Sequence, residues 1–317
     1  MIDRIAYVSI GVTSMATALK LWVKELGLQV VARRDGPDPA LSDLWGLPAD
    51  QFVHQVLLTT PGAMSGRLHL VQFREPAEAV RKGAASTDLG AKNIDVNCTD
   101  MPKRVEQLRA AGYSFRSAIG EYEIGGIQAR EVQVPLHDDI NLVLIEVLGE
   151  GFEVEYSPKG FAALTSFVVI VPDIEREAAF YKQLFGMEDM LSHKLSGPAI
   201  EMAAGLPPGT VLDLHLLGAP DNLFGRMELI EYIGVNGANR FERAVPPATG
   251  ILGCGFFTDS LEKFSNGAAA YDIPVIAKMK TDAIFGNGEV IQLASPAGLR
   301  IWMHQIGDAS LCVGEAQ

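Results

Sequence analysis

The feature that most constrains this chain is an internal repeat with a shift of 159 positions. The stretch GRLHLVQF (Gly66–Phe73) returns as GRMELIEY (Gly225–Tyr232), and the two agree in residue class except that His69 stands where Glu228 stands. A helical segment ending in ELGL or LFGM, a GLP tripeptide and a later glutamine recur at the same shift. Because several unrelated motifs align at one shift, we interpret the chain as two homologous halves.

Each half contains a fainter repeat of its own. An alternating apolar run leads into a helical stretch, and three further strand-like runs follow before the pattern begins again. The unit is therefore one strand, one helix and three strands, and it occurs four times. Each helix is expected to begin after a serine or aspartate, whose side-chain oxygen accepts a hydrogen bond from a free backbone amide. The expected caps are Ser14, Asp100, Asp173 and Asp259.

The repeat also predicts the domain boundaries. The first domain is expected at 1–149 and the second at 161–308, with two units in each. The linker at 150–160 is rich in glycine and charge and has no hydrophobic periodicity. Residues 309–317 are expected to form a tail.

The composition narrows the class of protein. Of 317 residues 48% are hydrophobic, which indicates a globular chain, and the net charge of −13 argues against a nucleic-acid partner. Three cysteines without a CxxC pair argue against a disulfide scaffold, and no apolar run approaches the ~18 residues of a membrane span. We expect a cytoplasmic protein with a small organic molecule as its partner and no membrane partner; a homodimer stays open.

The order of elements resembles the vicinal oxygen chelate superfamily, which includes glyoxalase I, extradiol dioxygenases and bleomycin-resistance proteins. The stretch FVVIVPDIEREAAFYKQLFGM (Phe167–Met187) carries the most specific likeness, and SPAGLRIW (Ser295–Trp302) is similar to the family's last turn and strand. The resemblance implies an α+β fold with four βαβββ units in two fused glyoxalase-like domains. Their mixed sheets would curl into bowls, with the helices outside.

The resemblance also implies where a metal would bind. Family members take ligands from the first and last strands of two units, usually histidine on the first strand and glutamate or histidine on the last. The positions here are Tyr7, Asn93, Ser166 and Leu252 on first strands, and His69, Leu144, Glu228 and Trp302 on last strands. With units one and two in one bowl and units three and four in the other, neither bowl has three ligands. We therefore expect no cofactor. A shift of two residues keeps the strand face and leaves one alternative, a divalent metal on His69, Asp95 and Glu146.

The N-terminal bowl is expected to be the more polar one. His69 or Glu146 would act as a base, Tyr7 as a hydrogen-bond donor to an oxygen, and Asp95 as their neighbour, because burial beside carboxylates tunes such groups for proton transfer. The residues expected to bind substrate are Asn93, Asn97, Ser9 and Trp45, the last from a long loop that would cover the bowl. An internally satisfied polar network without a ligand remains the alternative.

The C-terminal bowl is expected to offer Glu228, Trp302, His304 and Arg300. Trp302 could stack on a planar ligand, or it could simply fill the bowl, which we favour. We expect the N-terminal bowl to be the working one.

Three functions follow from these residues. The first is an enzyme that uses acid–base chemistry, of isomerase or lyase type, on a small carbonyl or phenolic compound. The second is a metal-free binding or resistance protein like the bleomycin-resistance proteins, and the sequence does not decide between these two. The third is a metal-dependent extradiol dioxygenase or glyoxalase with shifted ligands, which the missing histidines disfavour.

Overall fold

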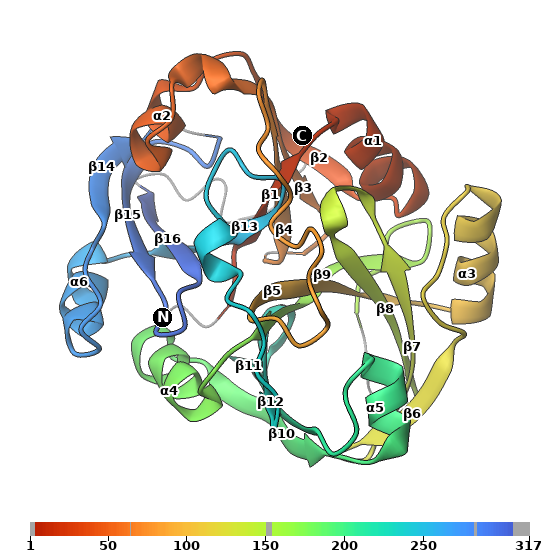
Figure 1. Ribbon diagram of the computed structural model, residues 1–317. Helices are drawn as coiled ribbons and strands as arrows, with labels where there is room; N and C mark the ends of the chain where they lie inside the picture. Colours follow the sequence, from red (N-terminus) through yellow and green to blue (C-terminus); the bar gives the residue numbers. More distant parts are fainter. Residues whose placement is uncertain (1–3, 64, 150–153, 282–283, 307–317) are drawn as a thin grey trace.

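The computed structural model describes residues 4–63, 65–149, 154–281 and 284–306 (Figure 1). Part of the expected linker and the whole expected tail at 309–317 lie outside the described residues. The first half contains β1 (Tyr7–Val12), α1 (Met15–Leu19) with a π-helical continuation (Lys20–Glu25), β2 (Gln29–Asp35), α2 (Pro39–Trp45), β3 (Phe52–Thr59), β4 (Arg67–Phe73), β5 (Gly90–Cys98), α3 (Met101–Ala110), β6 (Gly120–Ile124), β7 (Ile127–Pro135) and β8 (Asn141–Leu148).

The second half repeats this order, as the sequence predicts. It contains β9 (Phe161–Ile170), α4 (Ile174–Phe185), β10 (Glu188–Leu195), α5 (Pro198–Ala204), β11 (Val211–Ala219), β12 (Asn222–Ile233), β13 (Gly250–Thr258), α6 (Leu261–Ala269), β14 (Ala277–Thr281), β15 (Gly288–Ala294) and β16 (Arg300–Ile306). Short 3₁₀ turns occur at Ala49–Gln51, His137–Asp139 and Phe241–Arg243. The four strand–helix–strand units and the α+β class are confirmed.

The pairing of units differs from the expectation. Within the described residues, sheet 1 has the order β14-β15-β16-β13-β1-β4-β3-β2, and sheet 2 has the order β10-β11-β12-β9-β5-β8-β7-β6. Sheet 1 therefore joins units one and four, and sheet 2 joins units two and three. The expected bowls, each built from one half of the chain, are wrong. The boundary at 150–160 separates two sequence repeats but not the two sheets.

The glycines of the repeated motif show why the halves interlock. Gly66 and Gly225 both have positive φ, and a Cβ on either would lie 2.4 Å from a backbone oxygen of the other half, Leu164 for Gly66 and Ile5 for Gly225. The amide of Ile5 donates to the Gly225 carbonyl at 2.7 Å. Only glycine allows this approach, so the motif is a reciprocal contact between the halves.

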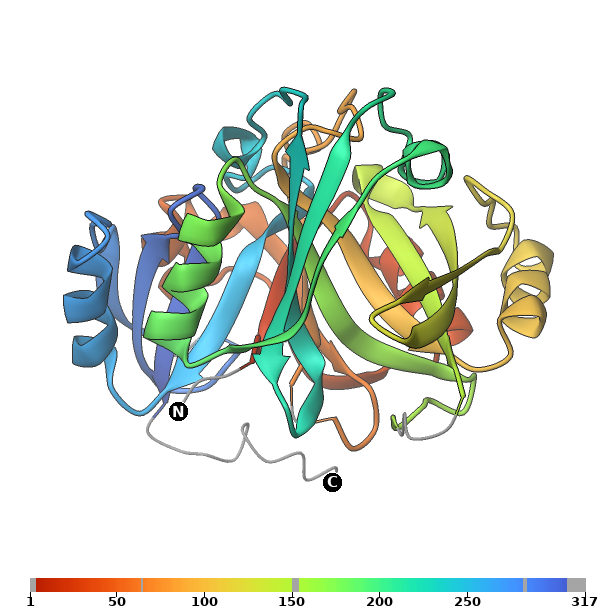
Figure 2. The same ribbon diagram turned by 90° about the horizontal axis from the view of Figure 1, so that it is seen from below.

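Each sheet has two distinct faces. The outer face packs against the long helices, and one continuous core combines the outer faces of both sheets with α1, α3, α4 and α6. In Figure 2, α6 (blue) and α3 (gold) lie at opposite sides of the molecule with strands of both sheets between them. The inner face is covered by α2 in sheet 1 and partly by α5 in sheet 2.

Two of the four expected helix caps are confirmed. Ser14 and Asp173 accept hydrogen bonds from the amides of Thr17 and Arg176. Asp100 has positive φ and no side-chain cap bond among the described residues, and α6 is capped by Ser260 rather than Asp259. In the part of the chain that the structure describes, no helix combines the length and apolar character needed to cross a membrane.

Candidate functional site

His69 lies on the inner face of sheet 1, within a linear series of buried hydrogen bonds. The Ser9 hydroxyl donates to Nδ1 of His69 at 2.9 Å, and Nε2 of His69 donates to Oε1 of Gln55 at 3.2 Å. The Gln55 amide in turn donates to the buried carboxylate of Asp38 at 2.8 Å. Burial first, and then the neighbouring His304, lowers the pKa of His69 to about 3, so the imidazole is neutral. His69 is 0% exposed, and both of its nitrogens are used.

Aromatic side chains fill the rest of this inner face. The Tyr7 ring stacks on Phe285 at 4.0 Å between centroids, and Trp302 lies 6.5 Å away in a nearly parallel plane. Trp45, the last residue of α2, packs on Trp302 at 5.4 Å. The Tyr7 hydroxyl donates to Nε2 of His304 at 2.6 Å. Tyr7, Trp302 and His304 are all less than 3% exposed, so this face is a packed core.

The inner face of sheet 2 has a different composition. Asp95 of β5 lies beside Ser166 of β9, and Glu228 lies beside Val168 on the neighbouring strand. The two carboxyl groups are hydrogen-bonded, with Asp95 as the protonated donor and Glu228 as the acceptor. Asp95 is 3% exposed, and its Oδ1 has no hydrogen-bond partner among the described residues.

Both carboxyl groups of this pair have raised pKa values. Burial, followed by the charge of Glu228, raises the pKa of Asp95 well above its usual range. Burial, followed by the charge of Glu131, raises the pKa of Glu228 to about 7, against the opposing effect of Arg226. The pair therefore holds a proton that it can exchange near neutral pH.

Cationic and phenolic groups surround the pair. Lys92 donates to the Tyr232 hydroxyl at 2.9 Å, and burial, followed by the charge of Arg81, lowers the pKa of Lys92 to about 8. Nε of Arg226 donates to the Thr165 carbonyl at 3.3 Å. On the other side, Tyr122 hydrogen-bonds to Glu131, whose pKa is raised by burial. The sequence analysis did not single out Lys92 or Glu131 as site residues, although alternation along β7 could have placed Glu131 on this face. Lys92 is three residues from Asp95, and it shares the face of Asp95 because β5 has a register shift between Ala91 and Asn93.

The two inner faces differ in accessibility at equivalent positions. Arg67 and His69 of sheet 1 are buried, whereas Arg226 and Glu228, one repeat later, are partly accessible. Lys92 and Glu131 are partly accessible too. The ionisable groups of sheet 2 are thus mostly buried but can still be reached from solvent, and a ligand site requires such access.

The other residues expected at the site are divided between these faces. Asn93 accepts from Asn141 at 2.9 Å on the inner face of sheet 2, and Nδ2 of the buried Asn97 has no partner among the described residues. Arg300 precedes Trp302 on β16 of sheet 1. His69, Tyr7, Ser9, Trp45, Trp302 and His304 are thus together in sheet 1, and Asp95, Asn93, Asn97 and Glu228 are in sheet 2.

Glu146 is the clearest error of the expected site. Its carboxylate accepts from the amides of Asp100 and Met101 at 2.7 and 3.2 Å, at the start of α3. These bonds place Glu146 on the outer face, and its neighbour Leu144 belongs to the outer core. Glu146 caps a helix that Asp100 was expected to cap.

A divalent metal does not fit the donor set of either face. His69, Asp95 and Glu146, the alternative metal set, lie on three different surfaces of the two sheets. Among the described residues no group of three His, Cys, Asp or Glu side chains is placed to hold a metal. On sheet 2 a third carboxyl group, that of Glu131, is on the same face as the pair, but among the described residues the three are not grouped to hold a metal ion.

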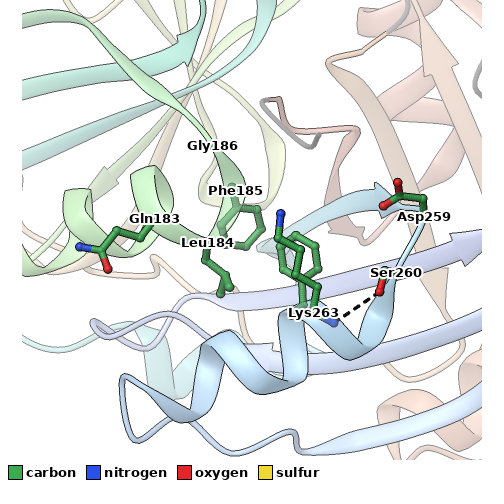
Figure 3. A pocket seen from close by; sticks show the side chains of 8 residues that line it. Gln183, Leu184, Phe185, Gly186, Asp259, Ser260 and Lys263 are labelled. Carbon is green, nitrogen blue, oxygen red and sulfur yellow. Dashed lines mark hydrogen bonds between the residues drawn. The ribbon is translucent and has the colours of Figure 1, made fainter.

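A separate cleft of about 540 Å³ lies between the end of α4 and the start of α6 (Figure 3). Leu184, Phe185 and Phe264 supply its apolar lining, and Asp259 and Lys263 lie at its edge. The cleft is on the outer side, away from the strand positions that carry the carboxyl pair.

Comparisons with known proteins agree on the fold. No protein-family model matches the chain, and a search of curated proteins finds no match. Glyoxalase I from Zea mays is similar in structure, with a TM-score of 0.66 and 14% identity over 96% of this chain and 92% of that one. A protein of Bacillus subtilis proposed to be a dioxygenase has a TM-score of 0.59 and 13% identity over 98% and 87% of the two chains.

The chain has the vicinal oxygen chelate fold. At these identities the likeness concerns the fold alone, and the activities of the similar proteins are not carried over by it. His69 lies on β4 and Glu228 on β12, the last strands of units one and three.

Proposed function

We propose that the inner face of sheet 2 is an active site for acid–base chemistry on a small carbonyl or phenolic compound. The observation that carries the proposal is the carboxyl pair: Asp95 is buried with an unpartnered oxygen, beside a partly accessible Glu228. A buried polar atom without a partner costs free energy, and a ligand hydrogen bond would recover it. This assignment replaces the N-terminal bowl, whose His69 is fully buried and fully hydrogen-bonded.

The proposed reaction is a proton transfer of isomerase type. The Glu228 carboxylate takes a proton from a carbon next to the ligand carbonyl, and the electron pair of that C–H bond shifts toward the carbonyl oxygen. The Lys92 ammonium donates a hydrogen bond to the oxygen as it gains charge. Return of the proton from Glu228 to the same carbon gives exchange, and return to another carbon gives an isomer.

Hydrogen–deuterium exchange tests this reaction without knowledge of the natural product. Purified protein is incubated in D₂O with 2-oxobutanoate, 2-hydroxyacetophenone or cyclohexyl methyl ketone, and loss of the proton signal next to the carbonyl is followed by NMR. We expect exchange above the buffer rate with at least one compound. Its absence with every compound would contradict the proposal.

A matched pair of variants locates the base. Glu228→Gln should reduce the exchange rate by about 100-fold or more, the usual contribution of a general base. His69→Gln changes the equivalent position of sheet 1 and should leave the rate within about two-fold, a difference of less than 0.5 kcal/mol in the barrier. A loss in His69→Gln with a normal Glu228→Gln would return the site to sheet 1.

Binding without turnover is the second candidate function. The unpartnered Oδ1 of Asp95 and Nδ2 of Asn97 favour it, because these atoms can bond to a ligand that is held and not converted. A compound that binds tightly and shows neither exchange nor conversion would identify a sequestering protein.

A further inference from the structure

Strand register allows the two inner faces to be compared position by position. Trp302 lies opposite Gln292 and beside Gly255 in sheet 1. Val143 lies opposite Gln133 and beside Asp95 in sheet 2, so it is the equivalent of Trp302.

Two further aromatic residues of sheet 1 have small equivalents. Tyr7 lies beside Arg67 as Ser166 lies beside Arg226, which makes Ser166 the equivalent of Tyr7. The short covering helices also correspond. The last residue of α2 is Trp45 and the last residue of α5 is Ala204, and each is followed by the tripeptide GLP. Ala204 is therefore the equivalent of Trp45.

The three aromatic side chains of sheet 1 that have small equivalents in sheet 2 pack together. Trp45 packs on Trp302 at 5.4 Å, and Trp302 lies 6.5 Å from Tyr7 at 12° between planes. In sheet 2 the same positions carry alanine, valine and serine, whose side chains are smaller than the rings they correspond to. A close-packed interior fills such a difference either with neighbouring side chains or with a ligand.

The walls around these positions are apolar on one side and polar on the other. Val168, Ile170 and Ile230 pack with Ile200 and Ala204 of α5 in one cluster. On the neighbouring strand β5, Oδ1 of Asp95 and Nδ2 of Asn97 have no hydrogen-bond partner among the described residues, and each residue is 3% exposed or less.

We propose that the inner face of sheet 2 binds a planar aromatic ring under α5, in the place that Trp45 and Trp302 fill in sheet 1. A hydroxyl substituent of that ring donates a hydrogen bond to Oδ1 of Asp95. Ala204 and Val143 are the specificity-determining residues, because their small side chains make room for the ring. This inference rests on the proposed function for its location, and it adds the class of substrate.

Two ketones of similar size test the requirement for a flat ring. Binding of 2-hydroxyacetophenone and of cyclohexyl methyl ketone to the wild-type protein is measured by calorimetry or ligand-observed NMR. The aromatic ketone should bind at least about 10-fold more tightly, which corresponds to one decade in the dissociation constant. Equal binding, or no binding of the aromatic ketone at millimolar concentration, would overturn the inference.

Variants on one helix then test the position of the ring. Ala204→Trp restores the indole present in sheet 1 and should weaken binding of the aromatic ketone by about 10-fold or more. Met202→Trp is the matched control, because Met202 is on the same helix and 84% exposed, and its affinity should stay unchanged. Val143→Trp gives a second block if Ala204→Trp is poorly folded. Unchanged affinity in a folded Ala204→Trp or Val143→Trp protein would refute the assignment.

The readouts separate this inference from the proposed function. Exchange on 2-oxobutanoate without any preference for rings would support proton transfer and reject the ring site. Ring binding that Ala204→Trp abolishes, without exchange on any compound, would support the ring site and reject proton transfer.

Discussion

His69 and Glu228 occupy the same position of the repeat, beside Ser9 and Val168 respectively, yet their surroundings are opposite. His69 is sealed in a hydrogen-bonded chain under aromatic rings, whereas Glu228 is partly accessible and hydrogen-bonded to a protonated Asp95. The difference of His69 and Glu228 between two otherwise similar strands therefore accompanies a difference between a fully buried inner face and a partly accessible one.

The pH dependence of the exchange rate follows from the groups on the inner face of sheet 2. Glu228 must be ionised to act as a base, so the rate should rise as the pH passes about 7. Lys92, with a pKa of about 8, loses its charge at higher pH, and the rate should then level off or fall. Lys92→Met should remove the alkaline limb and keep the acid limb. An acid limb that persists in Glu228→Gln would contradict the role of Glu228.

The stability of the protein should fall as the pH rises toward neutrality. The pKa of Glu228 is raised from 4.5 to about 7 by folding, so between these values the folded state keeps a proton that the unfolded state has released. The free energy of unfolding then decreases with pH, by up to about 1.4 kcal/mol per pH unit for one group. Urea unfolding at pH 5 and pH 8 measures the effect, and Glu228→Gln should reduce it. An unchanged difference in that variant would show that other groups cause it.

Removal of the Trp302 ring should affect stability and not catalysis. Trp302 is 1% exposed, packs on Trp45 and donates to Gln292 at 2.9 Å. Trp302→Ala should lower the free energy of unfolding by about 3–5 kcal/mol, the usual cost of emptying an aromatic core site. The exchange rate, measured at a temperature where the variant is folded, should match the wild type. Loss of ligand binding in a stable variant would place a ligand in sheet 1.

Glu146 should behave as a helix cap. Glu146→Ala removes the acceptor for two amides at the start of α3 and should cost about 1–2 kcal/mol in unfolding free energy. Its exchange rate should stay normal, whereas a role as the catalytic base requires a large loss of rate at unchanged melting temperature.

Chelation should leave the exchange reaction intact. Among the described residues no three His, Cys, Asp or Glu side chains are grouped to hold a metal, so the proposed chemistry is assigned to the side chains. Treatment with a strong chelator, followed by elemental analysis, should change neither the rate nor the melting temperature. Stoichiometric metal whose removal abolishes exchange would overturn this prediction.

The sequence alone determined the repeating unit and the direction of several side chains. The family resemblance implied that Tyr7, His69, Glu228 and Trp302 lie on inner faces, and the structure agrees, because the direction of a side chain is a local property of its strand. Cys254, in contrast, would share the inner face of the first-strand position Leu252 by simple alternation, but it lies in the outer core. A register shift between β1 and β13 near Ser9 explains the error, since one extra residue reverses the face of those that follow.

Only the tertiary structure decided which units share a sheet. The repeat makes the four units similar, so the local pattern contains no information on whether unit one pairs with unit two or with unit four. That choice depends on contacts between residues far apart in the chain, such as Gly225 against Ile5 and Tyr7 beside Gly255. Asp95 and Glu228 come together for this reason. They are 133 positions apart in the sequence and belong to different halves, and the antiparallel pairing of β5 with β9 brings them into hydrogen-bonding contact.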